Sequence, residues 1–206
     1  MAVPSRGLQI SRRSWLVASL AAPLFPAWGA DSLAVTYDGD NLHVSAPDLH
    51  FLTGKTLQRL KDGAEVAYVA QLTLFYDRFL TPFKRKETRF LVSYDIWGED
   101  RFAVTMPGPS PLSAKDLSAR GMEAWCLGNV WVTAAGIRTD REFWVQLEMV
   151  SGSQKDLSSV LGDSGISVDL IDLFSRLPAS DNRMMLQAGP LRLADLTRTP
   201  GRGRNG

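Results

Sequence analysis

The central part of the chain alternates between apolar and polar residues, which is the pattern of β-strands with one buried face. The longest alternation covers residues 66–77. One face carries Val66, Tyr68, Ala70, Leu72, Leu74 and Tyr76, and the opposite face carries Gln71, Thr73 and Asp77. A second alternation over Phe90–Ile96 is joined to a third over Phe102–Met106 by the turn Gly98-Glu99-Asp100. These segments predict an antiparallel sheet.

Shorter patterns predict the remaining elements. Strands are expected at Leu33–Tyr37, Leu42–Ala46, Val130–Ala134, Glu142–Val150 and Met184–Leu193, the last one broken at Gly189-Pro190. The Asp38-Gly39 pair predicts a hairpin between the first two. Helices are expected at Thr53–Lys61, at Val168–Leu177 and at Ser113–Trp125, where Ser113 and Asp116 have capping-box spacing. The predicted fold is mainly β (α+β), an antiparallel β-sandwich of about seven or eight strands with two or three short packed helices.

The first 29 residues have the features of a cleavable export signal. They contain no acidic residue, and the paired Arg12 and Arg13 precede an apolar run over Trp15–Phe25. The arginine pair, with a serine before it and Trp-Leu after it, resembles a twin-arginine motif, which is an address read by a receptor. The small residues Ala27 and Gly29 predict cleavage after Gly29, because a signal peptidase needs small side chains at these two positions.

This signal divides the chain into three parts. We expect a signal peptide of the twin-arginine type at residues 1–29, one β-sandwich domain at residues 30–196 and a disordered basic tail at residues 197–206. The apolar run is shorter than the roughly 20 residues that a bilayer span needs. The mature chain is therefore expected to be periplasmic or otherwise extracytoplasmic, with no transmembrane segment. The single cysteine, Cys126, excludes an internal disulfide and is expected to be a buried apolar side chain.

The charge balance argues against nucleic acid as a partner. The whole chain has 23 basic and 22 acidic residues. Three of the basic residues leave with the signal and three more lie in the tail, so the folded body has 17 basic against 22 acidic residues. Proteins that bind nucleic acid need a basic surface, which this acidic body does not supply.

The middle of the chain resembles a known family. A helix ending in Lys61-Asp62-Gly63 leads into the apolar strand Ala67–Phe75 and then into a basic, aromatic loop. A hairpin over Arg89–Val104 follows, with Leu-Val-Ser-Tyr near its start, and then an amphipathic helix and two strands. This series over residues 35–150 resembles the bacterial exported proteins known as domain of unknown function 4390. The resemblance implies a β-rich envelope domain and brings no catalytic residues with it.

No catalytic, cofactor or metal site is predicted. Gly162-Asp163-Ser164-Gly165 is similar to the nucleophile loop of trypsin-like proteases, but Gly136 stands where their histidine is needed, so the serine has no base. The two histidines, His43 and His50, do not have the spacing of zinc ligands. An enzyme that uses scattered carboxylates is the third hypothesis, because no spacing singles out an acid and base pair.

The most distinctive surface candidate is a basic loop made by Arg78, Lys84, Arg85 and Lys86, with phenylalanines between them. Such a loop suits an envelope protein or an anionic lipid surface; the alternative is a solvated loop with its phenylalanines turned inward. The first functional hypothesis is accordingly a non-enzymatic binding or interaction module of the cell envelope. The alternative is a small-molecule or lipid carrier, with a pocket between the sheets or under the predicted helix Ser113–Trp125.

The twin-arginine prediction can be tested directly. Changing Arg12→Lys and Arg13→Lys together should block export, because the export receptor reads the arginine pair itself. Immunoblots of periplasmic and cytoplasmic fractions measure the result. Unchanged export of the double variant would reject this route.

Overall fold

A computed structural model describes residues 33–97, 100–152 and 183–196 of the chain. These residues form two α-helices, α1 (Gly54–Lys61) and α2 (Ala119–Gly128), and a short 3-10 helix, η1 (Leu193–Asp195). They also form the strands β1 (Ala34–Tyr37), β2 (Asn41–Ser45), β3 (Val66–Phe75), β4 (Pro82–Asp95), β5 (Arg101–Met106), β6 (Leu112–Leu117), β7 (Trp131–Thr133), β8 (Phe143–Gly152) and β9 (Arg183–Leu191). The predicted signal peptide, the predicted helix Val168–Leu177, the Gly162–Gly165 loop and the predicted tail lie outside the described residues.

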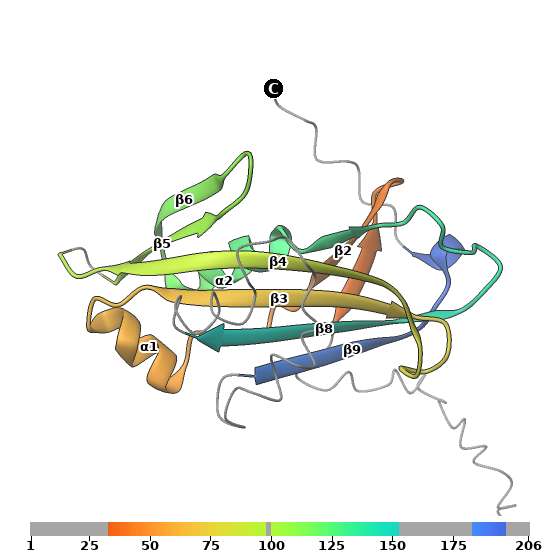
Figure 1. The fold of residues 1–206 in the computed structure, drawn as a ribbon, viewed down its shortest axis with the longest axis horizontal. Helices are drawn as coiled ribbons and strands as arrows, with labels where there is room; N and C mark the ends of the chain where they lie inside the picture. Colours follow the sequence, from red (N-terminus) through yellow and green to blue (C-terminus); the bar gives the residue numbers. More distant parts are fainter. Residues whose placement is uncertain (1–32, 98–99, 153–182, 197–206) are drawn as a thin grey trace, which may run out of the picture.

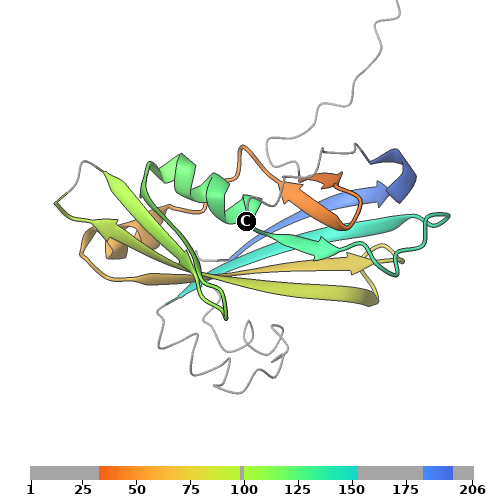
Figure 2. The ribbon, with the colours of Figure 1, turned by 90° about the horizontal axis from the view of Figure 1, so that it is seen from above.

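The strands form two antiparallel sheets. The large sheet has the order β6-β5-β4-β3-β8-β9, and the small sheet has the order β1-β2-β7. Figure 1 shows the long strands of the large sheet side by side, with α1 at the end where β3 begins. In Figure 2, the small sheet and α2 lie together on one face of the large sheet. The predicted class, a mainly β antiparallel sandwich with short packed helices, is confirmed.

The β1–β2 hairpin is held by the side chain of Asp38. Its Oδ1 accepts the backbone N–H groups of Asp40 and Asn41 at 2.9 and 2.6 Å, and its Oδ2 lies 2.8 Å from Nε2 of His43. These hydrogen bonds lower the pKa of Asp38 far below its ordinary value. Gly39 supplies a positive φ of 110° in the turn. The Asp-Gly hairpin prediction is confirmed.

The inner face of the large sheet, turned toward the small sheet and α2, forms the core. On β3 this face carries Val66, Tyr68, Ala70, Leu72 and Leu74, each no more than 2% exposed. They belong to one cluster with Leu42 and Val44 of β2 and with Met122 and Cys126 of α2. The alternation in the sequence therefore assigned the buried face of β3 correctly.

Cys126 packs in this core as a small apolar group. Burial raises the pKa of its thiol, and the thiol hydrogen is directed to Sδ of Met122 at 3.5 Å. A thiol in this setting stays protonated and unreactive. The expectation of a buried cysteine is confirmed.

The predicted helix at Ser113–Trp125 is wrong in its first half. Residues 112–117 form β6, which pairs with β5 at the edge of the large sheet, and the helix begins only after Ser118. Pairing with β5 satisfies backbone groups that a helix at this place would leave on an open sheet edge. Asp116, the supposed partner of the capping box, has a positive φ of 57°, which no right-handed helix contains.

The last strand is continuous where a break was predicted. Residues Arg183–Leu191 pair with β8 through Gly189-Pro190, with a register shift opposite Phe143–Val145. Gly189 is needed there, because a Cβ would come within 2.6 Å of the Trp144 ring. In the described part of the chain, no helix is long and apolar enough to span a membrane.

The position of the helix cap gives a stability prediction. The Ser118 hydroxyl accepts the N–H of Gly121 at 3.2 Å, so Ser118→Ala should lower the free energy of unfolding by about 1 kcal/mol in urea denaturation. Ser113→Ala is the matched control and should change it by less than about 0.5 kcal/mol, because Ser113 is exposed on β6. A larger loss of stability in Ser113→Ala than in Ser118→Ala would contradict this assignment and support Ser113 as the helix cap.

Candidate functional site

The second face of the large sheet is polar at its centre. We call it the pocket face and define it by Gln71, Thr73 and Phe75 of β3, which alternate with the core residues of that strand. Thr73 pairs with Arg85 of β4 on one side and with Gln146 of β8 on the other. Cross-strand partners lie on the same face of a sheet, so strands far apart in sequence bring their polar side chains together here.

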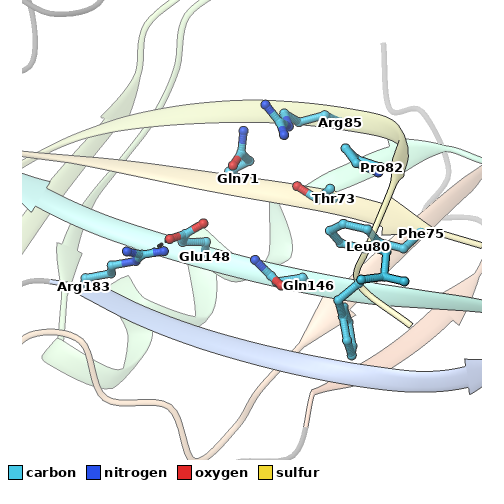
Figure 3. Close-up of a pocket in the computed structure, with 10 residues that line it drawn as sticks. Gln71, Thr73, Phe75, Leu80, Pro82, Arg85, Gln146, Glu148 and Arg183 are labelled. Atoms are coloured by element: carbon cyan, nitrogen blue, oxygen red, sulfur yellow. Dashed lines mark ion pairs between the residues drawn. The ribbon is translucent and has the colours of Figure 1, made fainter. Parts of the chain in front are cut away.

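A cavity of about 450 Å³ opens on the pocket face (Figure 3). Its polar end is lined by residues of β3, β4, β8 and β9, and its apolar end by residues around the β3–β4 turn. The polar lining is Gln71, Thr73, Arg85, Gln146, Glu148 and Arg183, and the apolar lining is Phe75, Phe79, Leu80 and Pro82. The volume lies in the range of small-molecule sites, and the lining is more polar than that of most such sites.

Glu148 is the one carboxylate among these lining residues. Its side chain is only 6% exposed, and its Oε1 lies 2.5 Å from Nε of Arg183 on the neighbouring strand. Burial raises the pKa of Glu148, while the positive charges of Arg183 and Arg85 act in the opposite direction. The ion pair therefore compensates part of the cost of placing a carboxylate inside the sheet.

The amides beside this ion pair are hydrogen-bond donors. Gln71 is 4% exposed, and its Nε2 has no hydrogen-bond partner. Gln146 accepts a hydrogen bond at Oε1 from Nε2 of Gln187, at 3.0 Å, which leaves its own amide N–H groups to the cavity side. A buried amide without a partner costs about 1–3 kcal/mol. Buried amides without a hydrogen-bond partner are rare in folded proteins, so the burial of the Gln71 amide needs an explanation.

The apolar end is shaped by a strained turn. Phe79 has a φ of 70°, a left-handed conformation that a bulky residue rarely adopts. Asp77 holds the turn: its carbonyl accepts the N–H of Leu80 at 2.7 Å and its carboxylate accepts the N–H of Thr81 at 2.8 Å. In this conformation the Phe79 ring lies edge-on to Phe75, with centroids 5.4 Å apart.

The predicted basic loop is wrong as a loop for three of its four residues. Only Arg78 lies in the turn; Lys84, Arg85 and Lys86 belong to β4 and alternate between its two faces. Arg85 lines the cavity on the pocket face. The other two face the small sheet, so the three cations do not form one surface.

Both lysines make contacts with β7 and the segment after it. Nζ of Lys84 donates hydrogen bonds to the carbonyl oxygens of Thr133, at 2.9 Å, and Ala135. Nζ of Lys86 lies 2.7 Å from the centroid of the Trp131 ring, a cation–π contact. Burial lowers the pKa of the Lys86 amine to about 8. These cations join the two sheets.

The histidines lie in two separate places away from this cavity. His43 contacts Asp38 in the first hairpin. Nδ1 of His50 lies 3.0 Å from Glu123, whose other oxygen accepts the N–H groups of Phe51 and Leu52. The carboxylate thus fixes the chain before α1, beside a second cavity of about 370 Å³. In the described ranges, no cluster of three or more metal-ligating side chains occurs.

Comparisons with models of protein families, with curated proteins and with solved structures found no match to this chain. The resemblance to domain of unknown function 4390 therefore stays a prediction from the sequence. Arg12 and Arg13 lie outside the described residues, so the export signal stays a prediction as well.

Sequence reasoning missed most of the cavity. It placed Gln71 and Thr73 on one face of their strand, but it gave no reason to join them to Gln146, Glu148 and Arg183. One feature of the sequence could have indicated a buried polar site. Glutamine and threonine occur in the longest apolar strand, and such a strand is expected at the centre of a sheet rather than at a solvated edge.

The raised pKa of Glu148 predicts a pH dependence of stability. Just above the ordinary glutamate pKa of 4.5, the folded state binds more protons than the unfolded state. The free energy of unfolding should therefore fall as the pH rises through this window. Glu148→Gln should remove that fall in denaturant titrations between pH 4 and 7.

The matched control is Glu142→Gln, at an exposed carboxylate that pairs with Arg192 on the surface. This variant should keep the fall in stability. The same pH profile in wild type and Glu148→Gln would show that the buried carboxylate does not titrate in this way.

Proposed function

We propose that the chain is an exported, non-catalytic binding protein of the cell envelope that holds a small ligand in the cavity of the pocket face. The observation that carries this proposal is the buried amide nitrogen of Gln71, which lines the cavity without a hydrogen-bond partner. A ligand with an acceptor group would satisfy this donor. The small-ligand hypothesis is thereby preferred to a protein–protein module, and its cavity lies on the pocket face rather than between the sheets.

The chemistry of the lining supports holding a ligand. Donors from four strands converge at one end, and aromatic and aliphatic side chains lie at the other (Figure 3). The carboxylate that an acid–base reaction would need, Glu148, is tied to Arg183. Rigid strands position these groups, which suits selective binding.

The arrangement also has the energetic character of a functional site. A strained Phe79, an unpartnered Gln71 and a buried Glu148 each lower the stability of the fold, and all three line one cavity. Unfavourable features that gather in one place are typical of sites kept for binding.

Gln71→Leu tests the proposal because it separates stability from binding. Removing the unpartnered amide should raise the free energy of unfolding of the empty protein by about 1 kcal/mol in urea denaturation. The same change should remove the ligand. Native mass spectrometry of wild-type protein, purified from its own envelope, should show added mass that Gln71→Leu has lost.

Gln58→Leu is the control for this experiment. It also replaces a glutamine, but this residue is exposed on α1, its side chain bonds only to Asp62 in the described part of the chain, and it does not line the cavity. It should keep the ligand and change stability by less than about 0.5 kcal/mol. Wild-type protein that is repeatedly free of ligand, together with a Gln71→Leu variant that is no more stable, would refute the proposed function.

A further inference from the structure

We propose that the ligand is an uncharged amide with an apolar group attached, the amide held at the polar end of the cavity and the apolar group at the other end. This inference rests on the proposed function and names the class of molecule that the cavity takes. It follows from three features of the described residues, namely two buried polar atoms of opposite character, the pairing of the charged side chains and the apolar end of the cavity.

Two buried polar atoms in the cavity lining have no hydrogen bond within the protein. One is a donor, Nε2 of Gln71, and the other is an acceptor, Oε1 of Glu148. In the described part of the chain, the only other buried side-chain atom in this state is the hydroxyl of Tyr68, on the inner face of β3. Oε1 of Glu148 contacts Arg183 as an ion pair but accepts no hydrogen bond. A ligand that completes this lining must therefore offer an acceptor to Gln71 and a donor to Glu148.

The donor and the acceptor come from adjacent strands. Gln71 of β3 pairs directly with Glu148 of β8, so their side chains leave the same face of the sheet side by side. The next pair on this face, Thr73 with Gln146, adds a hydroxyl and an amide two residues, or about 7 Å, along the strands. An amide carries its carbonyl oxygen and its N–H on separate atoms, which suits polar groups spread over such a block. A hydroxyl must accept and donate through one oxygen.

The charged side chains of the polar end already have partners in the structure. Arg183 pairs with Glu148, and Arg85 also has an interaction partner. The same holds for Glu87, which lies opposite Gln71 on β4 and outside the cavity lining. A carboxylate ligand would bring a second negative charge to Glu148 and offer it no donor, and an ammonium would offer Gln71 no acceptor. The lining therefore favours an uncharged group that both accepts and donates.

The apolar end has room for a hydrocarbon group. Phe75 and Phe79 form an aromatic wall with ring centroids 5.4 Å apart, and Pro82 lines the same end. Leu80 also lines this end and is 81% exposed, although it is a large apolar side chain. An apolar group in the cavity would cover Leu80 and gain the free energy of burying it. An amide with an aryl or alkyl group matches both ends together, and a small polar amide matches only one.

Four probes with the same hydrocarbon part test this assignment by isothermal titration calorimetry of the whole chain at neutral pH. They are 3-phenylpropanamide, 3-phenylpropanoate, 3-phenylpropylammonium and 3-phenylpropanol. The amide should bind at least about tenfold more tightly than each of the others. The reason is that only the amide gives Gln71 an acceptor and Glu148 a donor from separate atoms, and each buried group left without a partner weakens binding.

Glu148→Gln tests the role of the carboxylate. This variant removes the charge that repels 3-phenylpropanoate and introduces an amide that can donate to it, so the preference for the amide over the carboxylate should fall below about threefold. Glu142→Gln is the matched control. It makes the same change at an exposed carboxylate outside the cavity lining, and it should keep the tenfold preference.

The outcomes separate this inference from the proposed function. Binding of another probe as tightly as the amide, no binding of any probe, or an unchanged preference in Glu148→Gln would overturn the amide assignment. In each of these cases, a ligand that wild-type protein retains and Gln71→Leu loses would leave the proposed function standing. A Gln71→Leu variant less stable than wild type, with no ligand retained by either protein, would show that Gln71 bonds directly to Glu148 and would overturn both.

Discussion

The central strand β3 is buried along its whole length, and the rest of the structure depends on this constraint. It pairs with β4 on one side and with β8 on the other, so all its backbone groups between these neighbours are satisfied within the sheet. Its inner face closes the apolar core under the small sheet and α2. Its pocket face brings Gln71 and Thr73 into a position where water is scarce and each polar atom needs a partner.

The two faces of β3 have different consequences for stability. The inner face gains from the hydrophobic effect, because each of its large side chains is removed from water. The pocket face gains less, since Glu148 depends on Arg183 and the amide nitrogen of Gln71 has no partner at all. An apolar pocket face would be more stable, so the polar face is best explained by the ligand that we propose. In this proposal, the apolar core provides enough stability for the fold to tolerate the unfavourable polar groups that line the cavity.

The lysines of β4 show how a charged sequence can belong to a sheet. Lys84 and Lys86 extend their alkyl stems over the inner face, and their amines reach carbonyl oxygens and an aromatic ring of the small sheet. Arg85, between them, points to the opposite face and lines the cavity. A run of basic residues that looks like one solvated surface is therefore divided by the pleat of a strand into a contact between sheets and a part of the site.

The sequence by itself determined the mainly β class, most of the strands, helix α1, the Asp-Gly hairpin and the buried face of β3, because each depends on local periodicity or turn chemistry. It failed at residues 112–117 and at the start of β4, where pairing with a neighbouring strand outweighed the local pattern. The cavity was decided by tertiary structure alone. Gln71, Gln146 and Arg183 lie on three strands widely separated in sequence, and no local pattern specifies which strands become neighbours or how their registers align.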